Sequence, residues 1–127
     1  MGTANQEWTT IRTFSSTAAD SSGLASASDC VGVRGTGAKG LPHMVEFSLS
    51  GCSVGGSPTS ALIDLYRVTD GVVDFLTTWT ISGTDITNAK VTPIIVEAHA
   101  GRVYGKVSFS GGTSPTITGT LRARAVE

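Results

Sequence analysis

The chain has 127 residues, 16 of them glycine, with 15% charged residues and a formal net charge of −1. Nucleic-acid binding depends on neutralising many phosphates, so this charge argues against nucleic acid as the main partner. The sequence contains no apolar run near the roughly 20 residues that a transmembrane helix needs, and no signal-peptide pattern follows Met1. We therefore expect a protein made in the cytoplasm that does not span a membrane.

The length favours one domain, which buries roughly two-thirds of the surface of its unfolded chain and needs no metal or disulfide for stability. Two cysteines make neither a disulfide framework nor a zinc site. Cys30 and Cys52 stand in sequence next to small or apolar residues. We predict that both are buried or half-buried free thiols, and a disulfide between them stays open if two strands bring them together.

Residues 1–28 are predicted to form a flexible N-terminal arm, because most of this segment is small or polar and has little to bury. One possible strand lies within the arm at 7–14, where Trp8, Arg12 and Phe14 fall on one side by strict alternation. Residues 15–28 are rich in Ser and Ala and are predicted to be a long loop or a segment lying across another surface.

Residues 29–127 are predicted to form the folded domain. Alternating or β-branched segments separated by turn residues indicate further strands at 29–34, 43–50, 61–68, 72–81, 85–88, 91–98, 103–109 and 117–125. Asp70-Gly71 is a strong signal for a two-residue hairpin turn. The glycine-rich run at 35–40 lacks the Lys-Ser/Thr ending and the following helix of a phosphate-binding loop, so we predict a surface turn.

The most regular pattern is at 101–126, which we interpret as a long β-hairpin. Alternate residues of both arms are apolar or glycine, and the others are polar or cationic. The connection contains Gly111, Gly112 and Pro115, which suit a turn. On this interpretation Lys106, Arg122 and Arg124 share one face and form a small basic patch.

About eight strands and no convincing helix predict an all-β fold, an antiparallel β-sandwich for which a jelly roll is an economical closure.

The sequence indicates no catalytic site. His43 and His99 are the only histidines, each stands at a predicted strand end, and neither has metal-ligand spacing with Asp64, Asp70, Asp74 or Asp85. We expect no enzyme activity, no cofactor and no metal.

Two interpretations of the basic patch stay open. Cationic residues keep sheet edges from pairing with other chains, or they bind an acidic neighbour in an assembly. Trp8, Trp79 and Tyr104 are possible platforms for sugars, although Trp79 between two threonines fits the core better.

The segment Gly111-Gly112-Thr113-Ser114-Pro115-Thr116-Ile117-Thr118, with the strands on either side, resembles the closing hairpin of small tailed-phage virion proteins. The resemblance is to capsid decoration or cement proteins with a β-sandwich or jelly-roll fold. It covers about a quarter of the chain in detail, and the rest is similar in length, composition and polar N-terminal arm.

The resemblance implies a structural protein on the outer surface of a phage capsid, made in the host cytoplasm and bound to the major capsid protein as a trimer or dimer. The arm would become ordered on the shell. We expect Trp8, Arg12 and Phe14 to be its anchors, because aromatic and Arg side chains dominate interface energetics. A tail or baseplate component and a carbohydrate-binding module are the alternatives.

Overall fold

The computed structural model describes residues 8–33, 44–97 and 102–126. Within these ranges the strands are β1 (Thr9–Thr17), β2 (Val31–Gly32), β3 (Met44–Gly55), β4 (Ser60–Thr69), β5 (Val72–Ser82), β6 (Ile94–Glu97), β7 (Arg102–Ser110) and β8 (Thr116–Val126).

Two short helical segments accompany the strands. One is a 3-10 turn at Ala27–Asp29, and the other is helix α1 (Gly83–Thr87). The strand predicted at 85–88 is therefore wrong. Ser82 caps the helix instead, because its hydroxyl accepts a hydrogen bond from the Asp85 amide at 3.0 Å.

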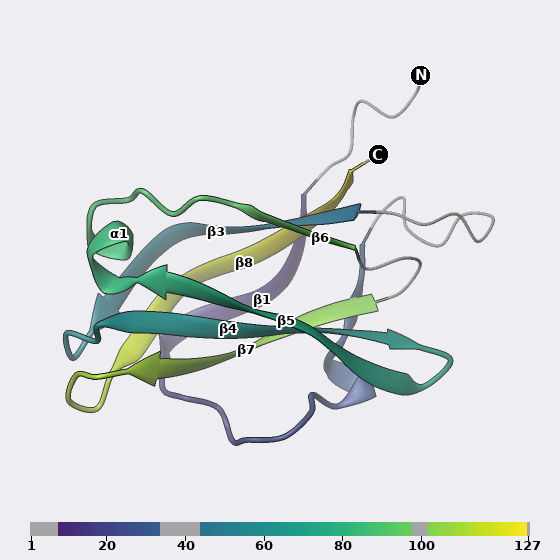
Figure 1. Ribbon diagram of the computed structural model, residues 1–127, viewed down its shortest axis with the longest axis horizontal. Helices are drawn as coiled ribbons and strands as arrows, with labels where there is room; N and C mark the ends of the chain where they lie inside the picture. Colours follow the sequence, from purple (N-terminus) through teal and green to yellow (C-terminus); the bar gives the residue numbers. More distant parts are fainter. Residues whose placement is uncertain (1–7, 34–43, 98–101, 127) are drawn as a thin grey trace.

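The strands form two antiparallel four-stranded sheets that face each other (Figure 1). Sheet A has the order β1-β8-β3-β6 and sheet B the order β2-β7-β4-β5. Chain order alternates between the sheets except at β4 and β5, which are neighbours in sheet B. This arrangement is that of a jelly roll, and it confirms the predicted all-β sandwich.

The hairpin predicted at 101–126 is wrong, although both of its strands exist. β7 pairs with β4 in sheet B, whereas β8 lies between β1 and β3 in sheet A. The two strands face each other across the core: a Cβ on Gly105 of β7 would lie 2.6 Å from Leu121 Cδ2 of β8. Gly111 and Gly112 have φ of 74° and 82°, and the connection carries the chain from one sheet to the other.

The hairpin predicted at Asp70-Gly71 is confirmed. Thr69 pairs with Val72, which leaves a two-residue loop between β4 and β5. Asp70 and Gly71 have φ of 54° and 81°, as a type I′ turn requires.

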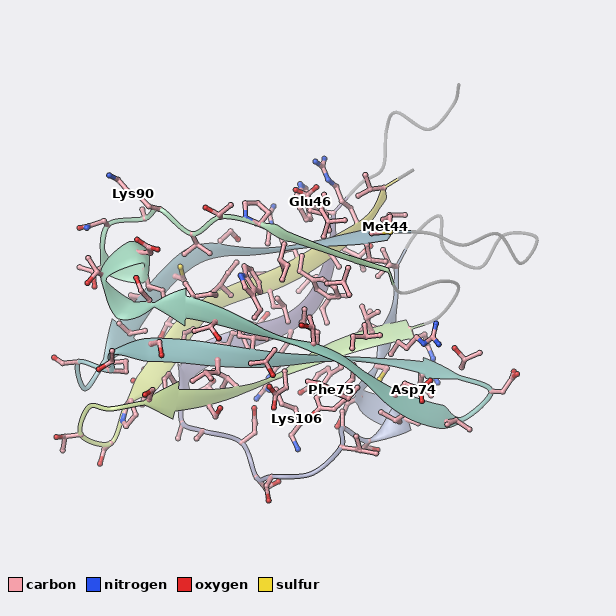
Figure 2. The ribbon with its side chains drawn as sticks, in the orientation of Figure 1. Met44, Glu46, Asp74, Phe75, Lys90 and Lys106 are labelled. Carbon is pink, nitrogen blue, oxygen red and sulfur yellow. The ribbon has the colours of Figure 1, made fainter. Side chains whose placement is uncertain are left out.

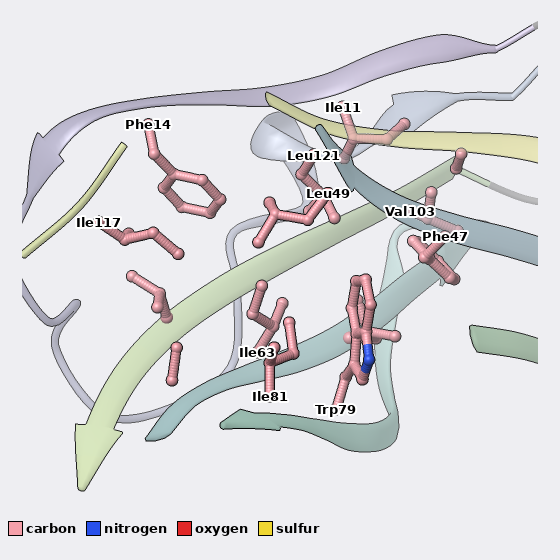
Figure 3. Packing of buried hydrophobic residues seen from close by; sticks show 14 of the residues in the cluster. Ile11, Phe14, Phe47, Leu49, Ile63, Trp79, Ile81, Val103, Ile117 and Leu121 are labelled. Atoms are coloured by element: carbon pink, nitrogen blue, oxygen red, sulfur yellow. The ribbon is translucent and has the colours of Figure 1, made fainter. Parts of the chain in front are cut away.

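The core fills the space between the sheets (Figure 3). Phe14, Phe47 and Leu121 are at most 1% exposed. Trp79 is 6% exposed and belongs to this core, as predicted. Two further predictions are confirmed, because Cys30 is a buried free thiol and Cys52 a half-buried one.

The folded domain begins before residue 29. β1 is an edge strand of sheet A, paired with β8 from Thr9 opposite Ala123 to Thr17 opposite Ile117. The predicted boundary between arm and domain is therefore wrong for residues 9–28. The rest of the predicted arm, residues 1–7, lies outside the described residues.

Residues 18–30, here called the strap, connect β1 to β2 along the outside of sheet B (Figure 1). The Asp20 amide donates to Val107 O at 2.8 Å, and the Asp20 carboxylate accepts from the Val107 amide at 2.7 Å. Further along, Tyr66 Oη and Lys106 Nζ donate to Gly23 O at 3.3 and 3.0 Å. The strap is thus bound to the sheet at two points.

Candidate partner-binding face

Three of the predicted partner-binding residues meet on the outer face of sheet A. The guanidinium carbons of Arg122 and Arg124 lie 4.8 and 4.5 Å from the centre of the Trp8 ring. These are cation–π contacts, and they hold an aromatic side chain on the sheet surface. The two arginines are two residues apart on β8 and therefore point to the same face of the sheet. Trp8 directly precedes β1, and the pairing of β1 with β8 brings it next to them.

An ion pair extends the group formed by Trp8, Arg122 and Arg124 across the sheet to β3. Arg124 stands opposite Glu46 of β3, and its Nε donates to Glu46 Oε1 at 2.7 Å. Glu46 stands in turn opposite Ile95 of β6. The side chain of Glu46 is 15% exposed and that of Arg124 is 39% exposed, so solvent reaches the pair mainly from the arginine side.

Exposed apolar side chains border the ion pair. Ile95 is 52% exposed and Met44, two residues before Glu46 on the same strand, is 38% exposed. Figure 2 shows Met44 and Glu46 on the same side of the sandwich. We call Trp8, Met44, Glu46, Ile95, Arg122 and Arg124 together the sheet A face.

Among the side chains that the structure describes on the sheet A face, two are arginines and one is a carboxylate. Glu46 balances Arg124, and no carboxylate among the described residues pairs with Arg122. Arg122 Nε is buried and makes no hydrogen bond within the described part of the chain. The guanidinium of Arg122 contacts the Trp8 ring through a cation–π interaction.

Arg12 and Phe14, also predicted anchors, have structural positions instead. A shift in the pairing between Thr10 and Arg12 breaks the strict alternation of β1, so that both Ile11 and Phe14 reach the core. Phe14 is 1% exposed and cannot contact a partner of the folded protein. Its prediction as an interface anchor is wrong.

Arg12 joins the two sheets and the strap. It donates to both carboxylate oxygens of Asp20 at 2.7 and 2.9 Å and to Gly105 O at 3.0 Å. Its guanidinium carbon also lies 4.7 Å from the Phe14 ring centre and 5.3 Å from that of Tyr104. The hydrogen bond with Asp20 raises the Arg12 pKa above its ordinary value. The Arg12 side chain is 15% exposed, which leaves little of it for a partner.

Lys106 does not belong to a patch with Arg122 and Arg124, so the predicted basic patch is wrong. Lys106 lies on β7 in sheet B, and its amine binds the strap. Figure 2 shows Lys106 on the side of the sandwich opposite Glu46, the partner of Arg124. The separation follows directly from β7 and β8 belonging to different sheets.

The described residues hold no group of three His, Cys, Asp or Glu side chains that could bind a metal ion. His43, His99 and the glycine-rich run at 35–40 lie outside the described residues. No helix within 8–33, 44–97 and 102–126 has the length and apolar character to cross a membrane. The two thiols are poor nucleophiles, because burial raises the pKa of Cys30 and of Cys52.

Comparison with known protein families, curated proteins and solved structures gives no match to this chain.

Sequence reasoning missed the residues that complete the sheet A face. Met44 and Glu46 have the alternation of an outward-facing strand, which is the signal that marks them as surface residues. Nothing in the local sequence pairs Glu46 with Arg124, which is 78 residues away. Asp20 was missed for the same reason, since its partners on β1 and β7 are set by the fold.

Proposed function

We propose that this protein is a non-enzymatic structural component of a phage virion that binds the outer surface of the capsid through the sheet A face. The resemblance of residues 111–118 and their flanking strands to small virion proteins suggests this class. The jelly roll supports it as an architecture common in viral capsid proteins. One fold hosts many functions, so the residues of the sheet A face indicate the function more specifically than the fold does.

The observation that carries the proposal is Trp8 held against Arg122 and Arg124. Aromatic and Arg side chains supply most of the binding energy in protein interfaces, especially where neighbouring contacts exclude water. Ile95 and Met44 provide such an apolar border. Because the two arginines are held against Trp8 on a central strand of sheet A, their own side chains lose little conformational entropy when a partner binds.

The charge of the face indicates the chemistry of its partner. Arg122 has no carboxylate partner among the described residues. An acidic side chain on the partner surface would form an ion pair with it. We infer that the major capsid protein supplies this acidic group at a junction between subunits. Binding as a trimer or dimer would multiply modest individual contacts into stable attachment.

Sedimentation with purified capsid shells tests the proposal. The shells are assembled from the major capsid protein encoded with this chain, and the wild-type protein should sediment with them. The double variant W8A/R122A should bind the shells at least about tenfold more weakly. It removes both the aromatic anchor, Trp8, and the arginine that has no carboxylate partner among the described residues, Arg122. Lys90, an exposed cation after α1, provides the matched control K90A, which should bind like the wild type.

Two results would overturn the proposal: a wild-type protein that stays in the supernatant, or a folded double variant that sediments as well as the wild type. A tail or baseplate component would use the same face on another partner. Parallel sedimentation with purified phage tails distinguishes that alternative, because sedimentation with tails and not with shells assigns the protein to the tail.

A further inference from the structure

A cavity of about 220 Å³ lies between the strap and the outer face of sheet B. Ser21 and Ser22 of the strap form one wall, and Asp64, Tyr66, Lys106 and Ser108 of β4 and β7 form the other. Pockets for drug-sized ligands are larger, at about 300 Å³ or more. The cavity has room for one small molecule and is far from the sheet A face, on the opposite sheet.

The charged groups of the cavity retain hydrogen-bonding capacity. Asp64 stands opposite Lys106 in the sheet, but each side chain is held by a different partner. Thr78 donates to Asp64 Oδ1 at 2.7 Å, so Oδ2 remains to accept from a ligand. Lys106 uses one hydrogen on Gly23 O, and its ammonium group has two more to donate.

The net charge of the lining favours a neutral ligand. Asp64 and Lys106 contribute opposite charges, and Asp20 at the edge of the cavity is paired with Arg12. An isolated phosphate or ammonium ion would meet one attractive and one repulsive group. The hydroxyls of Ser21, Ser22 and Ser108 both donate and accept, as do the hydroxyls of a polyol.

One aromatic residue, Tyr66, belongs to the lining of the cavity, and the exposed ring of Phe75, which is outside the lining, packs beside it. The rings of Tyr66 and Phe75 meet edge to face with centres 5.7 Å apart, and Phe75 is 51% exposed. Phe75 of β5 stands opposite Tyr66 of β4, and Lys106 of β7 stands opposite Asp64 of the same strand. The C–H face of a sugar ring packs on such an aromatic surface while its hydroxyls bind polar groups.

We propose that this cavity is a binding site for one residue of a neutral saccharide, with Asp64 and Lys106 as its principal polar contacts and Phe75 beside the adjoining residue. The wall formed by the strap is held in place, because Asp20 binds β7 and Gly23 O accepts from side chains of β4 and β7. A wall that is already in place lowers the entropy cost of binding. This site would give the virion protein a contact with surface glycans that is separate from capsid binding.

Titration of the full-length, ¹⁵N-labelled protein tests the site. The probes are glucose, galactose, mannose, N-acetylglucosamine and the corresponding short oligosaccharides, followed by amide chemical shifts. At least one should move the amides of residues 21–23, 64 and 106–108 in a saturable manner. Asp64→Asn, which keeps the side-chain shape, should weaken that binding at least about tenfold because a charge-assisted hydrogen bond is lost.

Two control variants show whether sugar binding belongs to this cavity. Asp74→Asn changes an exposed carboxylate on the neighbouring strand and should leave sugar binding unchanged. Trp8→Ala alters the sheet A face and should also leave it unchanged, so failure of capsid binding and failure of sugar binding are distinguishable. The proposal is wrong if no sugar in the panel moves these amides, if inorganic phosphate alone moves them, or if Asp64→Asn binds as the wild type does.

Discussion

Asp20→Asn is the most informative single change, because Asp20 joins β1, the strap and β7. Its carboxylate accepts from two nitrogens of Arg12 at 2.7 and 2.9 Å and from the Val107 amide at 2.7 Å. Asparagine keeps the size of the side chain but replaces one acceptor oxygen with an NH₂ donor. At least one Arg12 contact then becomes donor against donor, and the guanidinium loses its counter-charge.

The expected loss follows from the number and environment of these bonds. A hydrogen bond to a charged group contributes about 1.5–3 kcal/mol, and the variant loses one such bond together with the ion pair. The side chains of Arg12 and Asp20 are 15% and 21% exposed, so solvent screens the pair only partly. The bond from Arg12 to Gly105 O remains. We therefore expect a loss of about 2–3 kcal/mol in the free energy of unfolding, or about 10 °C in Tm.

The pH dependence provides a second measure of the same interaction. Burial by itself raises the pKa of Asp20, but the hydrogen bonds from Arg12 and Val107 outweigh it, and the net pKa lies below its ordinary value. A lowered pKa means that the stabilisation is complete above the unfolded value of about 3.9 and is lost as pH falls through the folded value. The difference between wild type and variant should thus be constant near neutral pH and shrink below about pH 4.

Urea unfolding followed by tryptophan fluorescence, repeated from pH 7 to acid, measures both quantities. The matched control is Asp74→Asn, which removes a carboxylate that is 49% exposed and 3.6 Å from Arg67. The control should lose no more than about 1 kcal/mol. If Asp20→Asn is no less stable than this control, or if its deficit persists unchanged in acid, the Arg12–Asp20 pair does not hold the strap as described.

Three further predictions concern the core, one connection and the thiols. Phe47→Ala should lose about 3–5 kcal/mol in urea unfolding because Phe47 is fully buried, and a loss below about 1 kcal/mol would contradict the described packing. Gly112→Ala should cost more than Gly71→Ala in thermal unfolding, since both have positive φ but only at Gly112 would a Cβ collide, 2.6 Å from Gly56 O. If both variants lose the same stability, the positive φ causes the whole loss and the collision at Gly112 contributes nothing. Cys30 should react with a thiol reagent at pH 8 at least about tenfold more slowly than free cysteine, because it is buried and its pKa is raised. In urea it should react at the rate of free cysteine. Rapid reaction in the folded protein would show that the Cys30 thiol is accessible.

Local patterns predicted the features that depend on near neighbours. The turn at Asp70-Gly71 is one, because two adjacent residues adopt positive φ with little help from the rest of the chain. The alternation along β7 and β8 is another, since it correctly marks Val107 and Leu121 as buried. Burial of Trp79 followed in the same way from its place in an alternating strand.

Those local patterns did not determine which strands pair with each other. A hairpin and a pair of strands facing each other across a core both bury every second residue, so the pattern at 101–126 fits either arrangement. The wrong choice also misplaced Lys106 relative to Arg122 and Arg124. The pairing shift in β1 is similarly invisible, and it moved Phe14 from a predicted surface to the core.

The sequence alone determined that this protein is an all-β sandwich, with most of its strands, one hairpin turn and the outward direction of Arg122 and Arg124. Only the tertiary structure decided that Trp8 lies against both arginines, that Glu46 pairs with Arg124 and that Asp20 ties the strap to the sandwich. The physical reason is the range of the interactions. Turn conformation and side-chain alternation depend on neighbours along the chain, whereas these contacts join residues whose proximity exists only once two sheets have paired and packed.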